Sequence, residues 1–583
     1  MGNYRNFTLA TYFVAHAAAR VTKEELEKQL SFVEKHLRLD KVYLEPWRGE
    51  LASHEQIEMI REVFERHGVR VAGGITTVIP TPEGEKPKAR LFNTFCYNDP
   101  AMRAKLKEVS AFTARHFDEF IIDDFFFTNC MCPDCVREKN AYNQAHGIAD
   151  GSWQQYRLDL LRRVSEEDMI GPAKAANPNV RITIKYPNWA ESYQETGYNP
   201  ADQRKLFDQL YTGTETRDPV TTDQHLPRYL SFSLMTYFEA MWPGHNGGGW
   251  FDNFDTHITE HYLEQAYLTA FSKPKELMVF CFQSMCDHMY TPALGYQLDK
   301  LDALLDHAGQ PAGIACYLPD NCQGEDNIQD FLGMNGLPIC CTPYFPEEAD
   351  QILLTRSSAY DPDIVRKLTA WLERTGGNAI VTTGFLEATR GKGIEALTSI
   401  RLRGRKITAD SYRVEEAKGG RCLFPRGEKP ISLPVAEFRN NSTWAVVKAA
   451  HDEESYGILL RDDYCGGHLW TLAVPDAFSD LYRLPAPVWS RIRQAVPVNG
   501  VWLEGPSRIS LFVYDNDAFV LYPYVMEGVQ RQVVRVHVQG ACGLSVPGRK
   551  QPLEPLYVQN GEAVFEAPAM PGQYVLCRVL RKG

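Results

Sequence analysis

The sequence predicts a (β/α)8 barrel followed by two smaller domains. Over residues 1–325, eight short apolar runs alternate with amphipathic stretches of helical periodicity, which is the pattern of repeated βα units. An open doubly wound sheet is the competing arrangement. Eight units in one block of this length favour a closed barrel, whose usual size is about 250 residues.

The predicted barrel strands share an apolar run of a few residues that a polar, glycine or aromatic segment ends. They are residues 7–14, 41–44, 69–75, 119–125, 181–185, 209–213, 277–282 and 313–317. Helical patterns between them include residues 23–36, 55–67, 100–116 and 152–176. The strands are too apolar for one-sided exposure, as expected of a parallel sheet covered by helices.

The rest of the chain changes character twice. Residues 326–497 resume a βαβ rhythm, with a helix at 361–375 that Gly376 and Gly377 follow, as helix C-termini favour. We therefore expect a flavodoxin-like α/β domain there, without a nucleotide, because its first turns lack Gly-x-Gly-x-x-Gly. Residues 498–583 show short alternating strands with Gly, Asn and Pro turns, which predict a β-sandwich.

Composition limits the classes of partner and compartment. The formal net charge of −12 argues against nucleic acid and anionic membrane surfaces as partners. No apolar run reaches the ~20 residues of a membrane span, and residues 1–5 do not begin a secretory leader. Fourteen scattered cysteines favour a reducing compartment. We expect a cytoplasmic protein; the alternative is a periplasmic protein whose leader has been removed.

Polar and aromatic groups follow several predicted strands, at the barrel end where such enzymes place their chemistry. Asp123 and Asp124 end the fourth strand. Strand neighbours point to opposite faces, so regular alternation lets only one of them point into the barrel. The other residues at strand ends or in the loops beyond are Glu45, Trp47, Arg48, Lys185, Tyr186, Trp189, Glu215 and Arg217.

A long connection follows the sixth predicted strand. Its Gly247-Gly248-Gly249 run permits a sharp turn or the close approach of a ligand. Trp250 and Asp252 come next, and we expect them in a loop that stacks on and hydrogen-bonds a sugar.

Three cysteines lie within six residues of the loop after the fourth strand. Cys130, Cys132 and Cys135 form a Cys-x-Cys-x-x-Cys run, and Cys96, after the third strand, supplies a fourth thiol. Four thiolates make a closed, structural zinc site. The alternatives are reduced thiols or a disulfide.

These features together resemble glycoside hydrolase family 42, the zinc-containing β-galactosidases with a trimerisation domain. That family has this domain order, and Cys96, Cys130, Cys132 and Cys135 match its cysteine layout. The resemblance implies a homo-oligomer, a trimer or dimer, and an acid/base catalyst near Asp124. Two departures stand out: Asp123-Asp124 replaces an Asn-Glu pair, and residues 277–284, the predicted seventh strand, end without the glutamate nucleophile.

Glycoside hydrolysis uses two carboxyl groups on either side of the scissile bond. We predict Asp124 and Glu215 as this pair, with Asp123 beside them, and a retaining hydrolase that removes a terminal, galactose-like or related sugar. The roles of acid and nucleophile stay open. Predicted substrate-binding residues are Glu45, Trp47, Arg48, Lys185, Tyr186, Trp189, Arg217, Trp250 and Asp252.

Simpler roles remain for several of these residues, since Glu45 with Arg48, and Glu215 with Arg217, would also form ordinary ion pairs. The alternatives for function are a lyase or dehydratase that uses Lys185 and Tyr186 as base and acid, and a barrel that binds carbohydrate without turnover.

Overall fold

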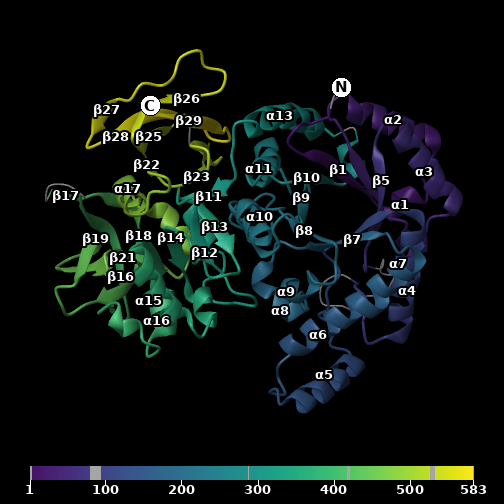
Figure 1. Cartoon of the computed structure of the whole chain (residues 1–583), viewed down its shortest axis with the longest axis horizontal. Coiled ribbons are helices and arrows are strands. Elements are labelled where there is room, and N and C mark those ends of the chain that lie inside the picture. The colour runs from purple at the N-terminus through teal and green to yellow at the C-terminus, as the bar shows by residue number, and fades with distance from the viewer. Residues whose placement is uncertain (1–2, 79–92, 287, 417–420, 526–531, 582–583) are drawn as a thin grey trace. The chain divides into compact units, whose positions relative to one another are not determined.

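The computed structural model describes residues 3–78, 93–286, 288–416, 421–525 and 532–581. The chain forms two compact units (Figure 1): residues 1–225 with 241–303, and residues 226–240 with 304–583. No helix in the described ranges is long and apolar enough to cross a membrane.

The first unit is a closed barrel of eight parallel strands, as predicted. In chain order they are β1 (Thr8–Phe13), β2 (Lys41–Leu44), β5 (Arg70–Ile75), β6 (Glu119–Ile122), β7 (Arg181–Tyr186), β8 (Gln209–Gly213), β9 (Asn246–Asp252) and β10 (Glu276–Phe280). β10 pairs with β1 and closes the barrel. A small hairpin, β3 (Trp47–Arg48) and β4 (Glu50–Leu51), follows β2.

Helices connect the strands and surround the barrel (Figure 1). They are α1 (Ala15–Ala18), α2 (Lys23–Glu34), α3 (His54–Arg66), α4 (Pro100–His116), α5 (Pro133–His146), α6 (Gln154–Val164), α7 (Gly171–Ala176), α8 (Tyr193–Thr196), α9 (Pro200–Gln203), α11 (Thr259–Ala270), α12 (Phe282–Met285) and α13 (Tyr290–Leu305). Their starts follow capping rules: Thr22 and Glu25 form a capping box on α2, and Asp99 caps α4.

Two strand predictions were wrong. The seventh strand is β9, the glycine-rich stretch that we expected to be a loop, and residues 277–282 contain the eighth. Glycine is required in β9 because a Cβ on Gly248 would lie 2.2 Å from the Glu276 carbonyl oxygen and 2.7 Å from the Tyr211 hydroxyl. The predicted eighth strand, 313–317, belongs to the second unit, so the barrel ends before it.

The barrel interior is packed rather than hollow. Alternate residues of the strands point inward and form one buried cluster: Ala10, Tyr12, Tyr43, Ala72, Ile121, Tyr211, Trp250 and Met278. At the strands' N-terminal end, buried Lys41 contacts Glu119 and lies 3.5 Å from Glu276. These charges satisfy one another at the closed end of the barrel and leave the carboxyl end for chemistry.

The second unit contains a ten-stranded mixed sheet. Its parallel strands are β12 (Ile314–Tyr317), β13 (Ile339–Thr342), β14 (Gln351–Leu354), β15 (Asn378–Thr382) and β21 (Gly467–Leu472). They lie in the order β13-β12-β14-β15-β21, which is the flavodoxin-like order 2-1-3-4-5. The antiparallel part comprises β16 (Arg401–Glu415), β17 (Cys422–Leu423), β18 (Arg426–Glu437), β19 (Thr443–His451) and β20 (Glu454–Tyr464).

Helices of this unit are α10 (Leu230–Met241), which the chain inserts between β8 and β9, α14 (Ile328–Met334), α15 (Ile364–Thr375), α16 (Thr383–Thr389) and α17 (Ala486–Ala495). α15 has a buried apolar face that packs on the sheet, with Leu368 and Trp371 fully buried. This helix and its Gly376 cap were predicted from the sequence.

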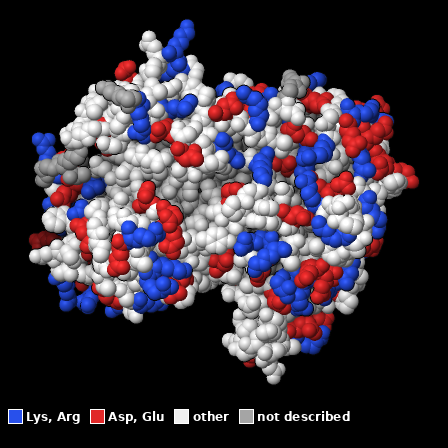
Figure 2. All heavy atoms as spheres, in the orientation of Figure 1, with Lys and Arg blue, Asp and Glu red and all other residues white. Residues whose placement is uncertain are grey.

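Two antiparallel sheets close the chain. One is β11 (Pro311–Ala312), β23 (Ile509–Tyr514), β24 (Ala518–Pro523), β29 (Val575–Arg581) and β26 (Ala541–Ser545); the other is β22 (Val501–Glu504), β25 (Gln532–Gln539), β28 (Glu562–Ala569) and β27 (Tyr557–Gln559). On the face that Figure 2 shows, basic and acidic side chains are intermixed, so the negative net charge does not gather into one patch there.

Candidate active site

The two aspartates of the fourth strand diverge because the strand ends just before them. β6 ends at Ile122, and the chain then turns, with the Phe125 amide donating to Asp123 Oδ1 at 3.1 Å. Asp123 Oδ2 lies 3.6 Å from an Arg48 nitrogen, whereas Lys185 donates to Asp124 Oδ2 at 2.5 Å. Strict alternation therefore does not apply to this pair, and both carboxylates reach the carboxyl end of the barrel.

Lys185, at the end of β7, joins two carboxylates. Its ammonium contacts Asp124 at 2.5 Å and Glu215 Oε1 at 3.1 Å, and it lies 4.4 Å from the centre of the Trp250 ring. Its side chain is 1% exposed. Burial lowers the pKa of Lys185, but Asp124 and Glu215 outweigh it and raise the pKa overall. The lysine is therefore a fixed cation between two acids.

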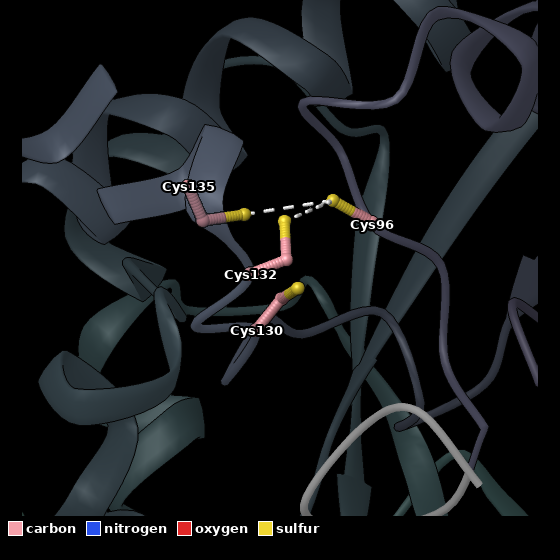
Figure 3. A group of neighbouring side chains, drawn as sticks. All are labelled: Cys96, Cys130, Cys132 and Cys135. Carbon is pink, nitrogen blue, oxygen red and sulfur yellow. Dashed lines mark hydrogen bonds between the residues drawn. The ribbon is translucent and has the colours of Figure 1, made fainter. Parts of the chain in front are cut away.

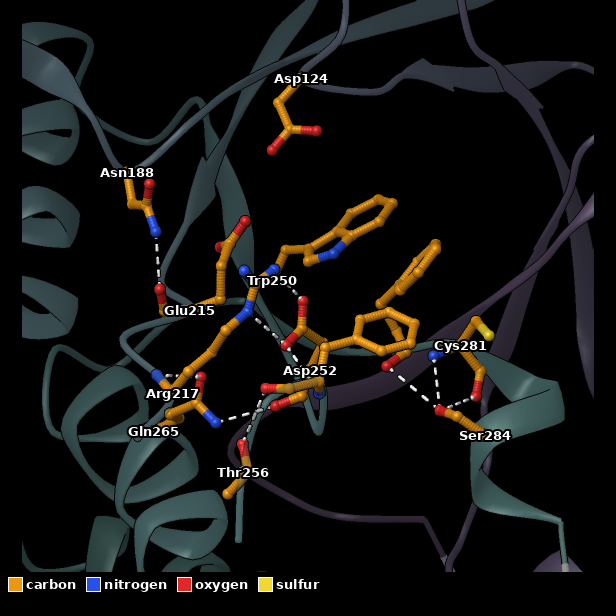
Figure 4. Close-up of polar contacts among 12 residues, drawn as sticks. Asp124, Asn188, Glu215, Arg217, Trp250, Asp252, Thr256, Gln265, Cys281 and Ser284 are labelled. Atoms are coloured by element: carbon orange, nitrogen blue, oxygen red, sulfur yellow. Dashed lines mark hydrogen bonds and ion pairs between the residues drawn. The ribbon is translucent and has the colours of Figure 1, made fainter. Parts of the chain in front are cut away.

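This shared contact limits the separation of the two acids. Their nearest oxygens cannot be farther apart than the sum of the two Lys185 distances. An oxygen–oxygen distance within that limit is compatible with the about 5–5.5 Å between carboxyl groups in retaining glycosidases. Figure 4 shows the Asp124 and Glu215 side chains extending toward each other beside Trp250.

The backbone of Glu215 is anchored by Asn188, and one oxygen of its carboxyl group has no hydrogen-bond partner among the described residues. Asn188 donates to its backbone carbonyl at 2.6 Å, while Oε2 has no hydrogen-bond partner among the described residues. Burial raises the pKa of Glu215 to about 7; Asp124 and Asp252 add to the rise and Lys185 opposes it. A carboxyl group with this pKa is protonated in part near neutral pH, as a general acid must be.

The corrected strand order places Asp252 at the end of the seventh strand. The family-42 resemblance implies a carboxylate nucleophile at the end of the seventh strand. In this chain Asp252 is a carboxylate at that position. However, Arg217 donates to both of its oxygens, at 2.9 and 2.7 Å, and Gln265 donates to its carbonyl at 2.8 Å. Arg217 thus holds the Asp252 carboxyl group in place and links it to the loop that carries Glu215.

A second charged group lies on the β2 side. Arg48 donates to Glu45 at 3.0–3.2 Å, and Glu45 in turn accepts from the Ala15 amide at 2.8 Å. Burial raises the pKa of Asp123 to about 7, with Arg48 opposing and Asp124 and Glu45 adding to it. The predicted Glu45–Arg48 ion pair forms, and it reaches the active-site carboxylates through Asp123.

The predicted aromatic residues separate into two groups. Trp250 points into the barrel, stacked on Phe280 at 5.1 Å and against Tyr12 at 5.2 Å. The other three do not join this cluster. Trp47 packs against Phe95, Trp189 against Phe127, and Tyr186 lies buried on the outer face of β7 with its hydroxyl on Gln203.

Sequence reasoning did not single out Asn188, Tyr12, Phe280 or Gln265. Asn188 and Tyr12 lay within segments that we examined, at the ends of β7 and β1. Phe280 ends β10, where a non-proline cis peptide bond joins it to Cys281. Gln265 is in the middle of helix α11, so nothing local indicated its contact with Asp252.

The four predicted cysteines come together (Figure 3). Their sulfur atoms all lie within 4.8 Å of one another, with Cys96 Sγ 3.5 Å from Cys135 Sγ and 3.9 Å from Cys132 Sγ. Tetrahedral zinc with bonds of about 2.3 Å separates its sulfurs by about 3.8 Å, so the group fits zinc. Asn98 donates to Cys135 Sγ at 3.2 Å, as an outer hydrogen bond to a metal thiolate would.

Comparisons with known proteins agree with this organisation. Residues 309–477 match the second domain of uncharacterized protein SSO3021, and that protein, from Saccharolobus solfataricus, is 24% identical over 518 residues, 82% of this chain and 84% of its own. The solved exo-beta-1,4-mannosidase Op5Man5 from Opitutaceae bacterium strain TAV5 is similar in fold, with a TM-score of 0.52 and 12% identity over 82% of this chain and 92% of that one.

The family model that matches the barrel is described as "probable glycosyl hydrolase, catalytic domain", and it covers residues 1–300. This match spans all eight strands, both acids and the cysteine group. The chain is therefore a glycosidase that belongs to this family of probable glycosyl hydrolases.

Proposed function

We propose that the protein is a retaining exo-glycosidase in which Asp124 is the nucleophile and Glu215 the acid/base catalyst. One observation carries the proposal: two carboxyl groups, one after β6 and one after β8, contact the same buried ammonium from β7, the strand between them, at 2.5 and 3.1 Å. This short separation favours attack by a carboxylate over attack by an interposed water.

The environments of the two acids assign their roles. Asp124 accepts a short hydrogen bond from the Lys185 ammonium, a contact that suits the nucleophile. Glu215 has a pKa of about 7 and an oxygen without a partner among the described residues. Asp124 attacks the anomeric carbon while Glu215 protonates the leaving oxygen. Glu215 then removes a proton from water, which attacks the glycosyl–Asp124 ester and releases the sugar with its configuration retained.

The contacts of Lys185 argue against the lyase alternative. A general base must lose its proton near the working pH, and the two carboxylates raise the pKa of this lysine. Its predicted acid partner, Tyr186, lies on the other face of β7, with its hydroxyl on Gln203.

For the substrate we propose a terminal galactose-like or related sugar. The test is turnover of aryl α- and β-galactosides, glucosides, mannosides, fucosides, arabinosides and glucuronides, with the first anomer of the released sugar followed by proton NMR. We expect one glycoside to be cleaved with retention. Inversion would contradict the assignment of a nucleophile, and cleavage of a glycoside other than a galactoside would correct the sugar alone.

We further propose that Cys96, Cys130, Cys132 and Cys135 hold a structural zinc ion. Four thiolates leave no open coordination position, so the metal would join the loops after β5 and β6 and take no part in the chemistry. The loop after β6 also carries Asp123 and Asp124.

Replacing Cys132 with serine should remove this zinc. We expect about one zinc per chain in the wild type and close to none in the variant, measured by elemental analysis, together with a lower melting temperature. The matched control is Cys465→Ser, because Cys465 is exposed and distant in sequence from the group. Equal zinc content in Cys132→Ser and wild type would contradict the proposal.

The homo-oligomer, a trimer or dimer, is likewise a proposal that rests on the family-42 resemblance. Light scattering coupled to size exclusion measures it directly. A measured mass of 66.2 kDa, that of a monomer, would contradict the proposed oligomer and would leave the proposed barrel chemistry unaffected.

A further inference from the structure

The sheet of the second unit has a topological switch point. β12 is the first of its parallel strands, and the chain adds β13 on one side of it and β14 on the other. The connection from β12 runs to β13 and the connection from β14 runs to β15, in opposite directions across the sheet, which opens a crevice outside the carboxyl ends of β12 and β14. In open α/β sheets, ligands bind in such crevices.

A cavity of about 360 Å³ lies at this position. It is lined by the segment after β12 with Gly324 and Glu325, by Arg356 after β14, by Gly384 after β15 and by Val474 after β21. Four parallel strands thus contribute their carboxyl-end loops to one cavity. Its volume falls within the about 300–1,000 Å³ of small-molecule sites.

Glu325 ties these loops together. Its carboxylate accepts from the Arg356 amide at 2.8 Å and from the Thr382 hydroxyl. Burial raises the pKa of Glu325, while these hydrogen bonds oppose the rise. A buried carboxylate that joins three loops gives the cavity a defined floor before any ligand binds, which lowers the ordering cost of binding.

Glycines keep that floor open. A Cβ on Gly384 would lie 2.2 Å from Glu325 Oε1, and Gly324, with φ at +151°, would bring its Cβ to 2.9 Å from the Arg356 side chain. Larger residues at these two positions would displace the groups that shape the cavity.

The lining combines apolar residues with balanced charges. Its apolar members include Leu402, Pro434, Pro475 and Phe478. Each of its cations has an acidic partner: Arg356 with Glu387 at 3.4 Å, Arg405 with Glu437 and Glu454 at 3.7 and 3.5 Å, and Lys406 with Asp476. These half-exposed pairs are weak and can exchange partners with a ligand.

We propose that this cavity binds a neutral monosaccharide. A sugar ring presents an apolar C–H face, which suits Phe478 and the prolines, and a rim of hydroxyls that accept from guanidinium groups and donate to carboxylates. The paired cations offer no excess positive charge to an anion, and the chain has no phosphate-binding glycine motif here. The choice of sugar over other neutral polar ligands rests on the proposed glycosidase function, whose released product would be this ligand.

Amide hydrogen exchange of the full chain, read by mass spectrometry, tests the site. The protein is Asp124→Asn, so that no turnover interferes, and the probes are galactose, mannose and glucose at up to tens of millimolar. We expect one sugar to slow exchange by about twofold or more in peptides that cover residues 324–326 and 474–478. Phe478→Ala combined with Arg356→Ala should abolish this protection, whereas Phe424→Ala, an exposed aromatic outside the cavity, should keep it.

Each outcome is decisive. If none of the three sugars protects these peptides, the inference is overturned. It is also overturned if protection persists in the double variant while that variant keeps the melting temperature of its parent. Hydrolysis by wild type without protection would leave the barrel function standing and remove this site. Protection without hydrolysis of any glycoside would keep the site and contradict the proposed function.

Discussion

Asp124→Gly should lose at least about 10³-fold in kcat/KM on an aryl glycoside, and sodium azide should restore much of the loss. The glycine leaves space beside the anomeric carbon, and azide enters it as a nucleophile in place of the carboxylate. A glycosyl azide of inverted configuration should accumulate, because one displacement replaces two. Mass spectrometry and NMR of this product identify the nucleophile.

Two neighbouring carboxylates are the matched controls. Asp123→Gly and Asp252→Gly change groups that are tied to Arg48 and Arg217, so we expect slower enzymes without azide products. If azide rescued Asp252→Gly instead of Asp124→Gly, the nucleophile would be at the end of the seventh strand, as in the family-42 resemblance. Asp124 would then be the acid.

Glu215→Ala should have an effect that depends on the leaving group. For a poor leaving group such as an alkyl or sugar alcohol, loss of the acid should lower kcat/KM by about 10²–10⁴-fold. For a dinitrophenyl glycoside, whose leaving group needs no proton, the loss should be small. The ratio kcat/KM is the right measure because it reports the first, bond-breaking step. Equal losses on both substrates would contradict the assignment of Glu215 as the acid.

The pH profile gives an independent test of the same group. Burial raises the pKa of Glu215 to about 7, and the protonated form is the active acid. The kcat/KM of wild type should therefore be sustained below pH 7 and fall as the pH rises through that value. In Glu215→Ala this alkaline limb should disappear. Asp123 also has a pKa of about 7, so Asp123→Asn, which should retain the limb, separates the two groups.

The barrel was predictable because its signal is local. Apolar runs that alternate with amphipathic helices identify seven of the eight strands and the surrounding helices, and cap residues such as Thr22 and Asp99 mark helix starts. β9 was missed because a run of three glycines is typical of a turn, although the close approach of Tyr211 and Glu276 requires a glycine at position 248 of the strand. The strand at 313–317 was misplaced because periodicity states that a strand exists and not which sheet it joins.

What the sequence by itself determined is the set of elements and the chemical groups at their ends: the barrel class, the four cysteines, and Asp124, Lys185 and Glu215 as candidates. Only the tertiary structure decided how these groups combine. Lys185 contacts both acids, Arg217 occupies both oxygens of Asp252, and Glu215 Oε2 is left without a described partner. The physical reason is that ionisation and reactivity depend on burial and on charges a few ångströms away, and those neighbours come from strands that lie far apart in the chain.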